Sequence, residues 1–250
     1  MKKNLFLLPL FLCLQLCAIS QSESIASLQD RANKLSKNFM DWLVYEAENV
    51  FLYSTYNTYN ADLTPIDKKT FLTALSSGKF MPIRLENKST LSYASIPITD
   101  SIDTDVKTTI QARSNLCLKY TKMEGTVLPT FELYDIHGKQ YSNESIKGKF
   151  VVINCWFVSC VPCVKEIPEL NELVKKYKKR EDILFLAIGF DGKNEMLDFN
   201  KQKKFNYNLI YNAKSYLMDI VGIESYPTHM VIQPDGTIAK IVPGDVKYIM

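Results

Sequence analysis

The sequence predicts an α/β protein in two parts. Residues 123–250 are expected to form a mixed central sheet flanked by helices, and residues 21–122 a smaller, mostly helical α+β domain. In the second part, strand-like apolar runs alternate with helical patterns, and long crossovers of this kind join parallel strands. Pro234-Asp235-Gly236 forms a turn between two short apolar runs, which predicts an antiparallel pair and therefore a mixed sheet.

Composition indicates a folded chain with a substantial core. The protein has 250 residues, of which 46% are hydrophobic and 23% charged, and this balance excludes a disordered protein. Residues 1–20 contain two lysines and no acidic residue, so without them the 30 basic residues fall to 28 against 27 acidic ones, a net charge of +1. This charge gives no reason to expect nucleic-acid binding.

The first 20 residues have the pattern of a signal peptide. Lys2 and Lys3 precede an apolar run from Leu5 to Cys17, and Ala18-Ile19-Ser20 resembles a small-residue cleavage site. Because a membrane span needs ~20 apolar residues, we expect cleavage of residues 1–20 and export to the periplasm. An uncleaved segment that anchors the protein to the membrane is the alternative.

Residues 21–122 predict two small helices, a hairpin and a longer helix. Apolar residues follow helical spacing from Ile25 to Ala47. A second short helix is expected between Thr64 and Gly78, with a cap, a first-turn proline at Pro65 and a C-terminal glycine. Two further features are expected, a hairpin of residues 80–85 and 90–96 and an amphipathic helix at residues 102–120.

No motif assigns a role to this first domain. Tyr53, Tyr56 and Tyr59 are spaced by three and could form a binding surface, although such spacing more often reflects packing. Cys117 is expected to be a free or buried thiol, with a bridge to Cys155 as the alternative.

The second part contains the remaining elements of the predicted sheet. The helix that follows Cys160 carries apolar residues at helical spacing, and Pro168 inside it is expected to bend its axis. The other expected elements are strands at 150–156, 183–188 and 208–211, a helix at 194–205, and hairpin strands at 228–233 and 237–242.

The sequence ends soon after the last predicted strand. Only six residues follow Gly244, which leaves no room for another helix to cover one face of the sheet. We therefore expect either a truncated sequence or a face covered by the N-terminal domain or by a second copy of the chain, since a large bare apolar patch is unusual in a monomer.

Cys160-Val161-Pro162-Cys163 stands where a strand passes into a helix. Two cysteines at this spacing can close a small disulfide ring, and a helix N-terminus favours a thiolate. A zinc site needs about four ligands, and the chain offers only His137 and His229 besides, without a second cysteine pair. A purely structural disulfide usually closes a longer loop. The pattern therefore favours a redox-active dithiol.

Further motifs surround this pair and together resemble a known family. They are Leu128-Pro129-Thr130-Phe131-Glu132-Leu133, Gly138-Lys139, Gly148–Asn154, Trp156, Glu166, Pro168, Tyr226-Pro227-Thr228 and Pro234-Asp235-Gly236. Over about half its length the chain resembles the thioredoxin superfamily, specifically the extracytoplasmic TlpA/ResA-like thiol-disulfide oxidoreductases, which are related to the AhpC/TSA redoxins. The resemblance implies a thioredoxin-like fold.

The resemblance also implies roles for particular residues. Cys160 would be the exposed nucleophile that attacks a substrate disulfide, and Cys163 the resolving thiol. Pro227, in the cis form, would leave the backbone beside it free to pair with a bound polypeptide. Contacts with substrate are expected from Trp156, Pro162, Tyr226 and Thr228. No cofactor and no metal is expected.

Glu166 matches an acidic residue that this group keeps beneath the dithiol. Disulfide exchange needs a thiolate for attack and a proton for the departing thiol, so a semi-buried carboxyl could relay protons. The alternative is that Glu166 merely supports the first helical turn. Asn154 stands where many thioredoxins carry a buried Asp, so the acid role cannot lie there, and Cys155 is expected to be a buried thiol on the opposite face of the strand.

The resemblance favours a reductase, because Pro162 before the second cysteine is similar to the reducing members. Expected partners are protein disulfides and an upstream electron-donor thiol protein in the membrane, and the sequence does not name the client. A thiol peroxidase would carry Pro seven residues and Thr or Ser three residues before the reactive cysteine, where this chain has Ile153 and Phe157. A non-catalytic binding module is the other alternative.

Overall fold

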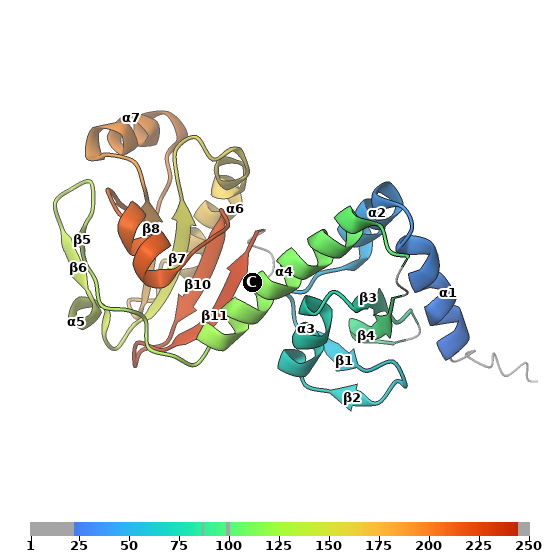
Figure 1. Ribbon diagram of the computed structural model, residues 1–250. Coiled ribbons are helices and arrows are strands. Elements are labelled where there is room, and N and C mark those ends of the chain that lie inside the picture. The colour runs from blue at the N-terminus through green and yellow to red at the C-terminus, as the bar shows by residue number, and fades with distance from the viewer. Residues whose placement is uncertain (1–22, 87, 99–100, 245–250) are drawn as a thin grey trace, which may run out of the picture.

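The computed structural model describes residues 23–86, 88–98 and 101–244, and these residues form two domains joined by one long helix (Figure 1). The segment predicted to be a signal peptide lies outside the described residues. In the described part of the chain, no helix is both long and apolar enough to cross a membrane.

The N-terminal domain packs helices against a four-stranded sheet of order β2-β1-β4-β3. Its elements are α1 (Ile25–Leu35), α2 (Phe39–Asn49), β1 (Asn57–Tyr59), β2 (Pro65–Ile66), α3 (Lys68–Ser76), β3 (Phe80–Arg84) and β4 (Ser92–Pro97). The predicted hairpin is found as the antiparallel pair β3–β4. Tyr53, Tyr56 and Tyr59 pack against the core of this domain, as the packing interpretation expected.

The helix predicted from Ile25 to Ala47 is two helices in the structure. Asn38 starts α2, because its side-chain oxygen accepts hydrogen bonds from the N–H groups of Met40 and Asp41 at 2.8 and 3.2 Å. Asn is among the best residues at this capping position. The apolar spacing continues across the break, so periodicity alone did not reveal it.

The start of the next helix also differs from the prediction. Pro65 lies in β2 instead of the first helical turn. Asp67 caps α3, since its carboxylate accepts a hydrogen bond from the Thr70 N–H at 2.9 Å. Gly78 follows the end of α3 with φ +71°, a conformation that favours glycine, as expected.

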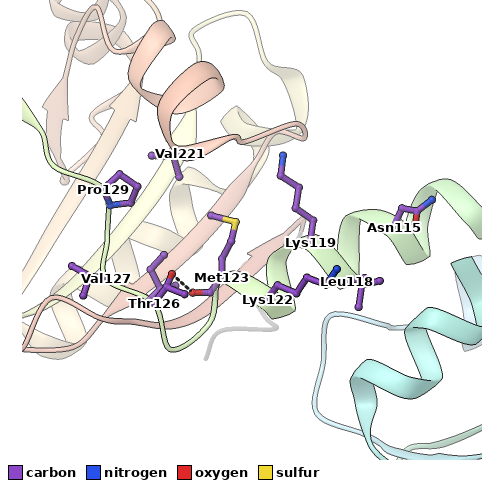
Figure 2. Close-up of a pocket in the computed structure, with 10 residues that line it drawn as sticks. Asn115, Leu118, Lys119, Lys122, Met123, Thr126, Val127, Pro129 and Val221 are labelled. Atoms are coloured by element: carbon purple, nitrogen blue, oxygen red, sulfur yellow. Dashed lines mark hydrogen bonds between the residues drawn. The ribbon is translucent and has the colours of Figure 1, made fainter.

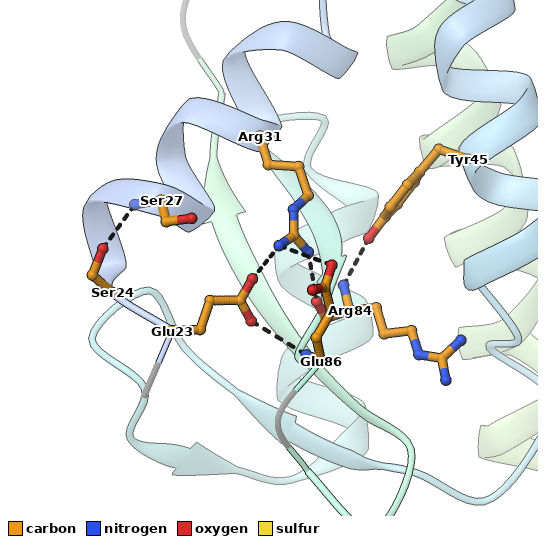
Figure 3. A network of polar contacts seen from close by, with 7 residues as sticks. All are labelled: Glu23, Ser24, Ser27, Arg31, Tyr45, Arg84 and Glu86. Atoms are coloured by element: carbon orange, nitrogen blue, oxygen red, sulfur yellow. Dashed lines mark hydrogen bonds and ion pairs between the residues drawn. The ribbon is translucent and has the colours of Figure 1, made fainter. Parts of the chain in front are cut away.

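Arg31 on α1 ties the first helix to the edge of the sheet (Figure 3). Its guanidinium pairs with the Glu23 carboxylate, lies 3.1 Å from the Glu86 carboxylate and donates to the Arg84 carbonyl at 3.0 Å. The Arg84 N–H in turn donates to the Tyr45 hydroxyl at 2.8 Å. The network fixes α1, α2 and the end of β3 relative to one another.

The long helix α4 (Thr104–Met123) extends from the N-terminal domain to β11 (Figure 1). Val106, Ile110 and Cys117 pack into the N-terminal core, whereas Tyr120 packs into the core of the second domain. After α4 the chain runs beside β11, and the Gly125 N–H donates to the Ile238 carbonyl at 2.8 Å. One helix therefore belongs to both hydrophobic cores.

The second domain has the predicted mixed sheet, with strand order β11-β10-β7-β8-β9. β7 and β8 pair in parallel, as do β8 and β9, whereas β10 pairs antiparallel with β7 and with β11. The strands are β7 (Phe150–Trp156), β8 (Ile183–Gly189), β9 (Asn208–Ile210), β10 (Thr228–Ile232) and β11 (Ile238–Pro243).

Helices lie over this sheet and a small hairpin stands beside it (Figure 1). The helical elements are α5 (Asn143–Ile146), α6 (Val161–Tyr177), α7 (Lys193–Lys203) and the π-helix η1 (Tyr216–Val221), and the hairpin is β5 (Glu132–Tyr134) with β6 (Gln140–Ser142). One buried cluster packs under α6 and α7 and another packs on the opposite face with Tyr120 of α4. On the α6 side a groove of about 340 Å³ stays open between Phe150, Val152, Tyr177 and Val231, and no residue of α4 lines it.

Candidate functional site

The site begins at the junction of β7 and α6, where Cys160 and Cys163 form a disulfide with Cα atoms 5.3 Å apart. Cys160 caps α6, and its sulfur accepts a hydrogen bond from the Cys163 N–H at 3.3 Å. The loop between strand and helix is fixed to the end of β8, because the Val158 N–H donates to the Asp191 carboxylate at 2.7 Å. A helix N-terminus stabilises negative charge on the capping sulfur once the disulfide is reduced.

Cys160 is not exposed in this oxidised state, contrary to the expectation. Cys160 is 3% exposed and Cys163 is 1% exposed, because both pack in the apolar cluster under α6 with Trp156 and Ile167. Val161, next to Cys160, is largely exposed. Little of the disulfide is therefore open to solvent in this oxidised state.

A shallow hollow of about 270 Å³ lies beside this first turn. It brings together Pro162 and Glu166 of α6 with Pro227, which precedes β10, and its other lining residues are Lys165, Glu169 and Gly244. The Tyr226–Pro227 peptide bond is cis, as the resemblance implied. Pro162 and Pro227, 65 positions apart in the sequence, thus share one surface feature next to the dithiol.

Two residues expected to touch substrate do not reach the surface. Trp156 is fully buried and packs on Phe199 and Phe205, with ring centroids 5.1 and 5.4 Å away. Thr228 is also fully buried, and its hydroxyl donates to the Ser225 carbonyl at 2.7 Å. The alternation of side chains along a strand turns both of them into the core. Their side chains support the site from beneath.

The other two predicted contact residues do remain accessible. Pro162 is exposed, and Tyr226 is partly buried in an aromatic group with Phe157 and Phe190. Phe157 and Phe190 stack with ring centroids 5.4 Å apart, and the Tyr226 ring lies 4.9 Å from Phe190. This group forms an apolar, aromatic margin beside the dithiol.

Glu166 lies one helical turn after Cys163 and is held in a buried polar network. Its carboxylate accepts a hydrogen bond from the Asn154 side-chain amide at 3.0 Å. The other carboxylate oxygen lies 3.1 Å from Nε2 of His229, and Nδ1 of His229 lies 3.3 Å from the same Asn154 amide nitrogen. Glu166 is 8% exposed and His229 is fully buried. The simple support of a helical turn does not account for these contacts.

Sequence reasoning considered His229 only as a candidate zinc ligand and gave Asn154 no role in the site. The signal that could have found His229 is its place in the strand that follows Pro227, where alternation turns it to the opposite face from its neighbours Thr228 and Met230. In the described part of the chain, no group of three or more His, Cys, Asp or Glu residues could hold a metal ion.

Tyr207 adds a further buried hydroxyl on the same side of the sheet. Burial, and second to it the negative charge of Glu166, raises the pKa of Tyr207 above its ordinary value. Its hydroxyl has no hydrogen-bond partner among the described residues, and neither has the Trp156 indole nitrogen. Tyr207 therefore stays protonated beside the network.

The remaining described cysteines are separate from the dithiol. Cys117 and Cys155 are free and buried, in the cores of different domains, so the alternative of a bridge between them is not seen. Burial raises the pKa of Cys117 to about 12, and full burial raises that of Cys155 as well. Cys155 faces away from Trp156, as predicted, and neither thiol is suited to exchange.

A larger hollow of about 550 Å³ lies where α4 passes into the second domain (Figure 2). Lys119, Lys122 and Met123 line it from α4, and Val127 and Pro129 line it from the segment that follows. Within it the Thr126 hydroxyl donates to the Met123 carbonyl at 2.7 Å. None of the predicted site residues borders this hollow.

Comparison with known proteins assigns the second domain to a family. Residues 125–241 match the AhpC/TSA family. The chain is 30% identical over 122 residues to the thiol-disulfide oxidoreductase ResA of Bacillus subtilis (strain 168), which covers 48% of this chain and 68% of that protein. It is 31% identical over 129 residues to ResA of Bacillus thuringiensis subsp. konkukian (strain 97-27), covering 51% and 74% of the two chains.

Among solved structures, StoA from Bacillus subtilis aligns with a TM-score of 0.43 and 21% identity, over 50% of this chain and 98% of that one. The chain belongs to the TlpA/ResA-like thiol-disulfide oxidoreductases of the thioredoxin superfamily.

Proposed function

We propose that this protein is an exported reductase of protein disulfides and that Cys160 and Cys163 carry the electrons. The observation that supports this most directly is the Cys160–Cys163 disulfide at the start of α6, beside a hollow that contains Pro162, Glu166 and Pro227. A polypeptide lying in that hollow would pass both the dithiol and the backbone next to Pro227. Cys160 is the nucleophile of the proposal, because it is the helix-capping sulfur.

The proposed reaction starts from the reduced dithiol. The Cys160 thiolate attacks one sulfur of a substrate disulfide, forms a mixed disulfide and releases the other substrate sulfur as a thiolate, which takes up a proton. Cys163 then loses its proton, attacks the Cys160 sulfur and releases the second substrate thiolate, which is protonated in turn. Two electrons and two protons pass to the substrate, and the Cys160–Cys163 disulfide is left.

Glu166 is proposed as the base that receives the Cys163 proton and returns it to the departing substrate thiolate. Its carboxylate is buried one helical turn from Cys163 and also lines the hollow. General acid–base groups of this kind contribute about 10²-fold or more to rate. A supporting role for Glu166 alone would leave the pH dependence of the Cys163 step unchanged in Glu166→Gln.

The reducing direction rests on Pro162. The reduction potentials of dithiols in this fold run from about −270 mV in reductants to about −120 mV in strong oxidants. A proline before the second cysteine resembles the motif of the reducing members. Equilibration with glutathione buffers of known ratio measures the potential directly. A value near the oxidising end overturns the reductase assignment and leaves the oxidoreductase activity intact.

Export to the periplasm rests on residues 1–20, with their two lysines and apolar run. An oxidising compartment supplies protein disulfides for a reductase to act on, and its electrons are proposed to come from a thiol protein in the membrane. Cell fractionation with N-terminal sequencing tests this: a mature chain starting near residue 21 in the soluble periplasm is expected. Retention of the first 20 residues in the membrane fraction would replace it with the anchored alternative.

Trapping of partners is the decisive experiment. In Cys163→Ala the resolving step is lost, so substrates remain covalently bound through Cys160 and can be identified by mass spectrometry. Cys160→Ala is the control that captures nothing, and Cys155→Ala is the matched control whose insulin-reduction rate stays at the wild-type level. If insulin reduction persists in Cys160→Ala, the proposed function is wrong.

A further inference from the structure

We propose that His229 is the positioning residue of Glu166. Its ring N–H holds the carboxylate in place and keeps it ready to accept the Cys163 proton. This inference rests on the proposed role of Glu166 as the base. Nothing in the family motifs described above singles out His229.

The hydrogen bonds fix which ring nitrogen of His229 carries the proton. The Asn154 amide nitrogen has two N–H donors and no acceptor. One donates to the Glu166 carboxylate at 3.0 Å, and the other points to Nδ1 of His229 at 3.3 Å. Nδ1 must therefore be the acceptor, which leaves the hydrogen on Nε2, and Nε2 donates to the second Glu166 oxygen at 3.1 Å. We assign a neutral His229 protonated at Nε2.

This arrangement is consistent with an ionised Glu166. Both carboxylate oxygens receive a hydrogen bond, one from Asn154 and one from His229. If the Asn154 amide were turned over, its oxygen would face a carboxylate oxygen and the two acceptors would repel each other. Hydrogen bonds to a charged group are also stronger than those between neutral groups. The network thus favours the form of Glu166 that can take a proton.

The network is built on rigid elements. His229 in β10 lies directly opposite Asn154 in β7, as the register of the two strands shows, and Glu166 reaches them from α6. All three side chains are buried. A side chain held by two neighbouring strands cannot move far, so Glu166 is presented to the dithiol in one position.

The other polar groups around the network do not replace His229. Tyr207 lies before β9, and the Glu166 charge adds to the effect of burial in raising its pKa. Its hydroxyl makes no hydrogen bond among the described residues. Lys165 and Glu169 of α6 line the hollow with Glu166, and the disulfide itself carries no charge. Within the described residues, the two carboxylate oxygens of Glu166 are occupied by Asn154 and His229.

The alternative is that His229 has a structural role only, as a buried histidine whose ring nitrogens are hydrogen-bonded. In the proposal, by contrast, His229 acts on a defined step. The Cys163 proton moves to Glu166, the Cys163 thiolate forms the bond to Cys160, and the substrate sulfur leaves with its electron pair. His229 stays neutral throughout, since Nδ1 is already occupied by Asn154, and it lowers the cost of holding Glu166 charged until the proton arrives.

The experiment isolates that step with an aromatic disulfide, 5,5′-dithiobis(2-nitrobenzoic acid), added to the reduced protein. Cys160 releases one coloured thiolate on attack, and Cys163 releases the second when it closes the disulfide. The leaving thiolate is stable without a proton, so the rate of the second phase against pH reports the loss of the Cys163 proton. The variants are His229→Phe, His229→Gln, Glu166→Gln and the double variant His229→Phe with Glu166→Gln.

In His229→Phe, the second phase is expected to slow about tenfold at neutral pH, the effect of one lost hydrogen bond to a charged group. The pH profile of the second phase should change with it, because the carboxylate has lost one of its two hydrogen-bond donors. His229→Gln restores a donor and most of the rate. The double variant behaves like Glu166→Gln alone, since His229 acts only through Glu166. His137→Gln, which changes the other histidine of the chain on an exposed turn, leaves the profile unchanged.

Two results distinguish a failure of this inference from a failure of the proposed role of Glu166. A His229→Phe profile that superimposes on the wild type overturns the positioning role, whereas an unchanged Glu166→Gln profile overturns the proposed base and with it this inference. If His229→Phe does not fold, His229→Gln and the spectrum of the wild-type protein decide. Long-range ¹H–¹⁵N correlation spectra should show a neutral His229 protonated at Nε2, and protonation at Nδ1 or at both nitrogens overturns the assignment.

Discussion

Cys117 and Tyr120 lie one turn apart on α4, yet their side chains belong to the cores of different domains. The Tyr120 hydroxyl also accepts a hydrogen bond from the Glu224 N–H at 3.1 Å, in the segment that leads to Pro227. The same helix therefore touches the N-terminal core and the loop that borders the dithiol. The N-terminal domain is thus linked to that loop through a single helix.

Tyr120→Phe tests this connection. The change leaves the Glu224 N–H without its acceptor, so the free energy of unfolding should fall by about 1 kcal/mol, and insulin reduction should slow because the loop before Pro227 is less fixed. Tyr216→Phe is the matched control: its hydroxyl donates to the Pro129 carbonyl at 2.9 Å, away from that loop. It should lose similar stability in urea unfolding without losing activity, and equal activity losses in both variants would contradict the connection.

The ion pair of Glu46 and Arg113 gives a second prediction. Glu46 on α2 is buried, and its carboxylate lies 2.6 Å from the half-exposed Arg113 on α4. Burial raises the pKa of Glu46 above its ordinary value, although the Arg113 charge and hydrogen bond lower it in part. A raised folded-state pKa stabilises the fold at pH below the ordinary value of 4.5, and this contribution is lost as pH rises through the folded-state pKa.

At neutral pH the ionised Glu46 is therefore a cost that Arg113 offsets. Arg113→Met should lower the free energy of unfolding by about 1 kcal/mol at pH 7. The effect is no larger because solvent can reach this ion pair. The loss should shrink as the pH is lowered and Glu46 becomes protonated. Adding Glu46→Gln to Arg113→Met should restore stability, and a double variant as unstable as the single one argues against this cause.

The free thiols of Cys117 and Cys155 are expected to be inert in the folded protein. Their raised pKa values keep them protonated at pH 8, and both are buried. Alkylation of the oxidised protein with iodoacetamide, followed by peptide mass mapping, should label neither until denaturant is added. After reduction, Cys160 should be labelled first. Rapid labelling of Cys155 in the folded state would show that its face of the sheet opens.

The stability of the fold at alkaline pH gives a second test of the raised pKa of Cys117. Its pKa is about 12 in the folded protein against a reference of 9.0, so its contribution to stability is complete below pH 9 and is lost between pH 9 and about 12. Wild type should therefore lose stability more steeply than Cys117→Val in that range, by at most about 1.4 kcal/mol per pH unit. Buried tyrosines titrate in both proteins, so parallel curves would mean that the thiol is not the cause.

Local patterns predicted most elements of the second domain. The apolar run before Cys160 is β7, the Pro-Asp-Gly turn joins β10 to β11, and the crossovers produce the parallel pairs. These features depend on residues close together in the sequence. The break at Asn38 was missed because apolar spacing continued through it, and Pro65 was misplaced because proline suits an edge strand as well as a first helical turn.

The polar network of Glu166, His229 and Asn154 could not be predicted from local sequence patterns. Glu166 was predicted from its position after Cys163, but His229 is 63 residues away and Asn154 is 12 residues away in the other direction. Their meeting depends on the register of β7 against β10, which is set by packing of the whole sheet. The burial of Cys160 likewise depends on side chains from β7 and α6 that surround it.

Gly189, the last residue of β8, packs against Trp156 and Met196, which share a buried cluster with the dithiol, and replacing it tests that packing. A Cβ at this position would press on the Met196 side chain and lie 3.1 Å from the Trp156 indole nitrogen and 3.3 Å from the Trp156 carbonyl oxygen. Met196 can move its end group, but Trp156 is fully buried against Phe199 and Phe205. Gly189→Ala should therefore destabilise the fold by about 1–3 kcal/mol and change the reactivity of reduced Cys160, as measured by urea unfolding and alkylation rate.

Gly192→Ser, three residues further on, is the matched control. The Cβ at Gly192 meets only the Asn212 side chain at 4.0 Å, and this glycine caps α7 without a side-chain hydrogen bond. Serine supplies the missing acceptor, so stability should stay constant or rise by a few tenths of a kcal/mol, with Cys160 reactivity unchanged. If Gly189→Ala is equally harmless, the space behind Trp156 is loose, and burial of the dithiol cannot be ascribed to tight packing on the β8 side.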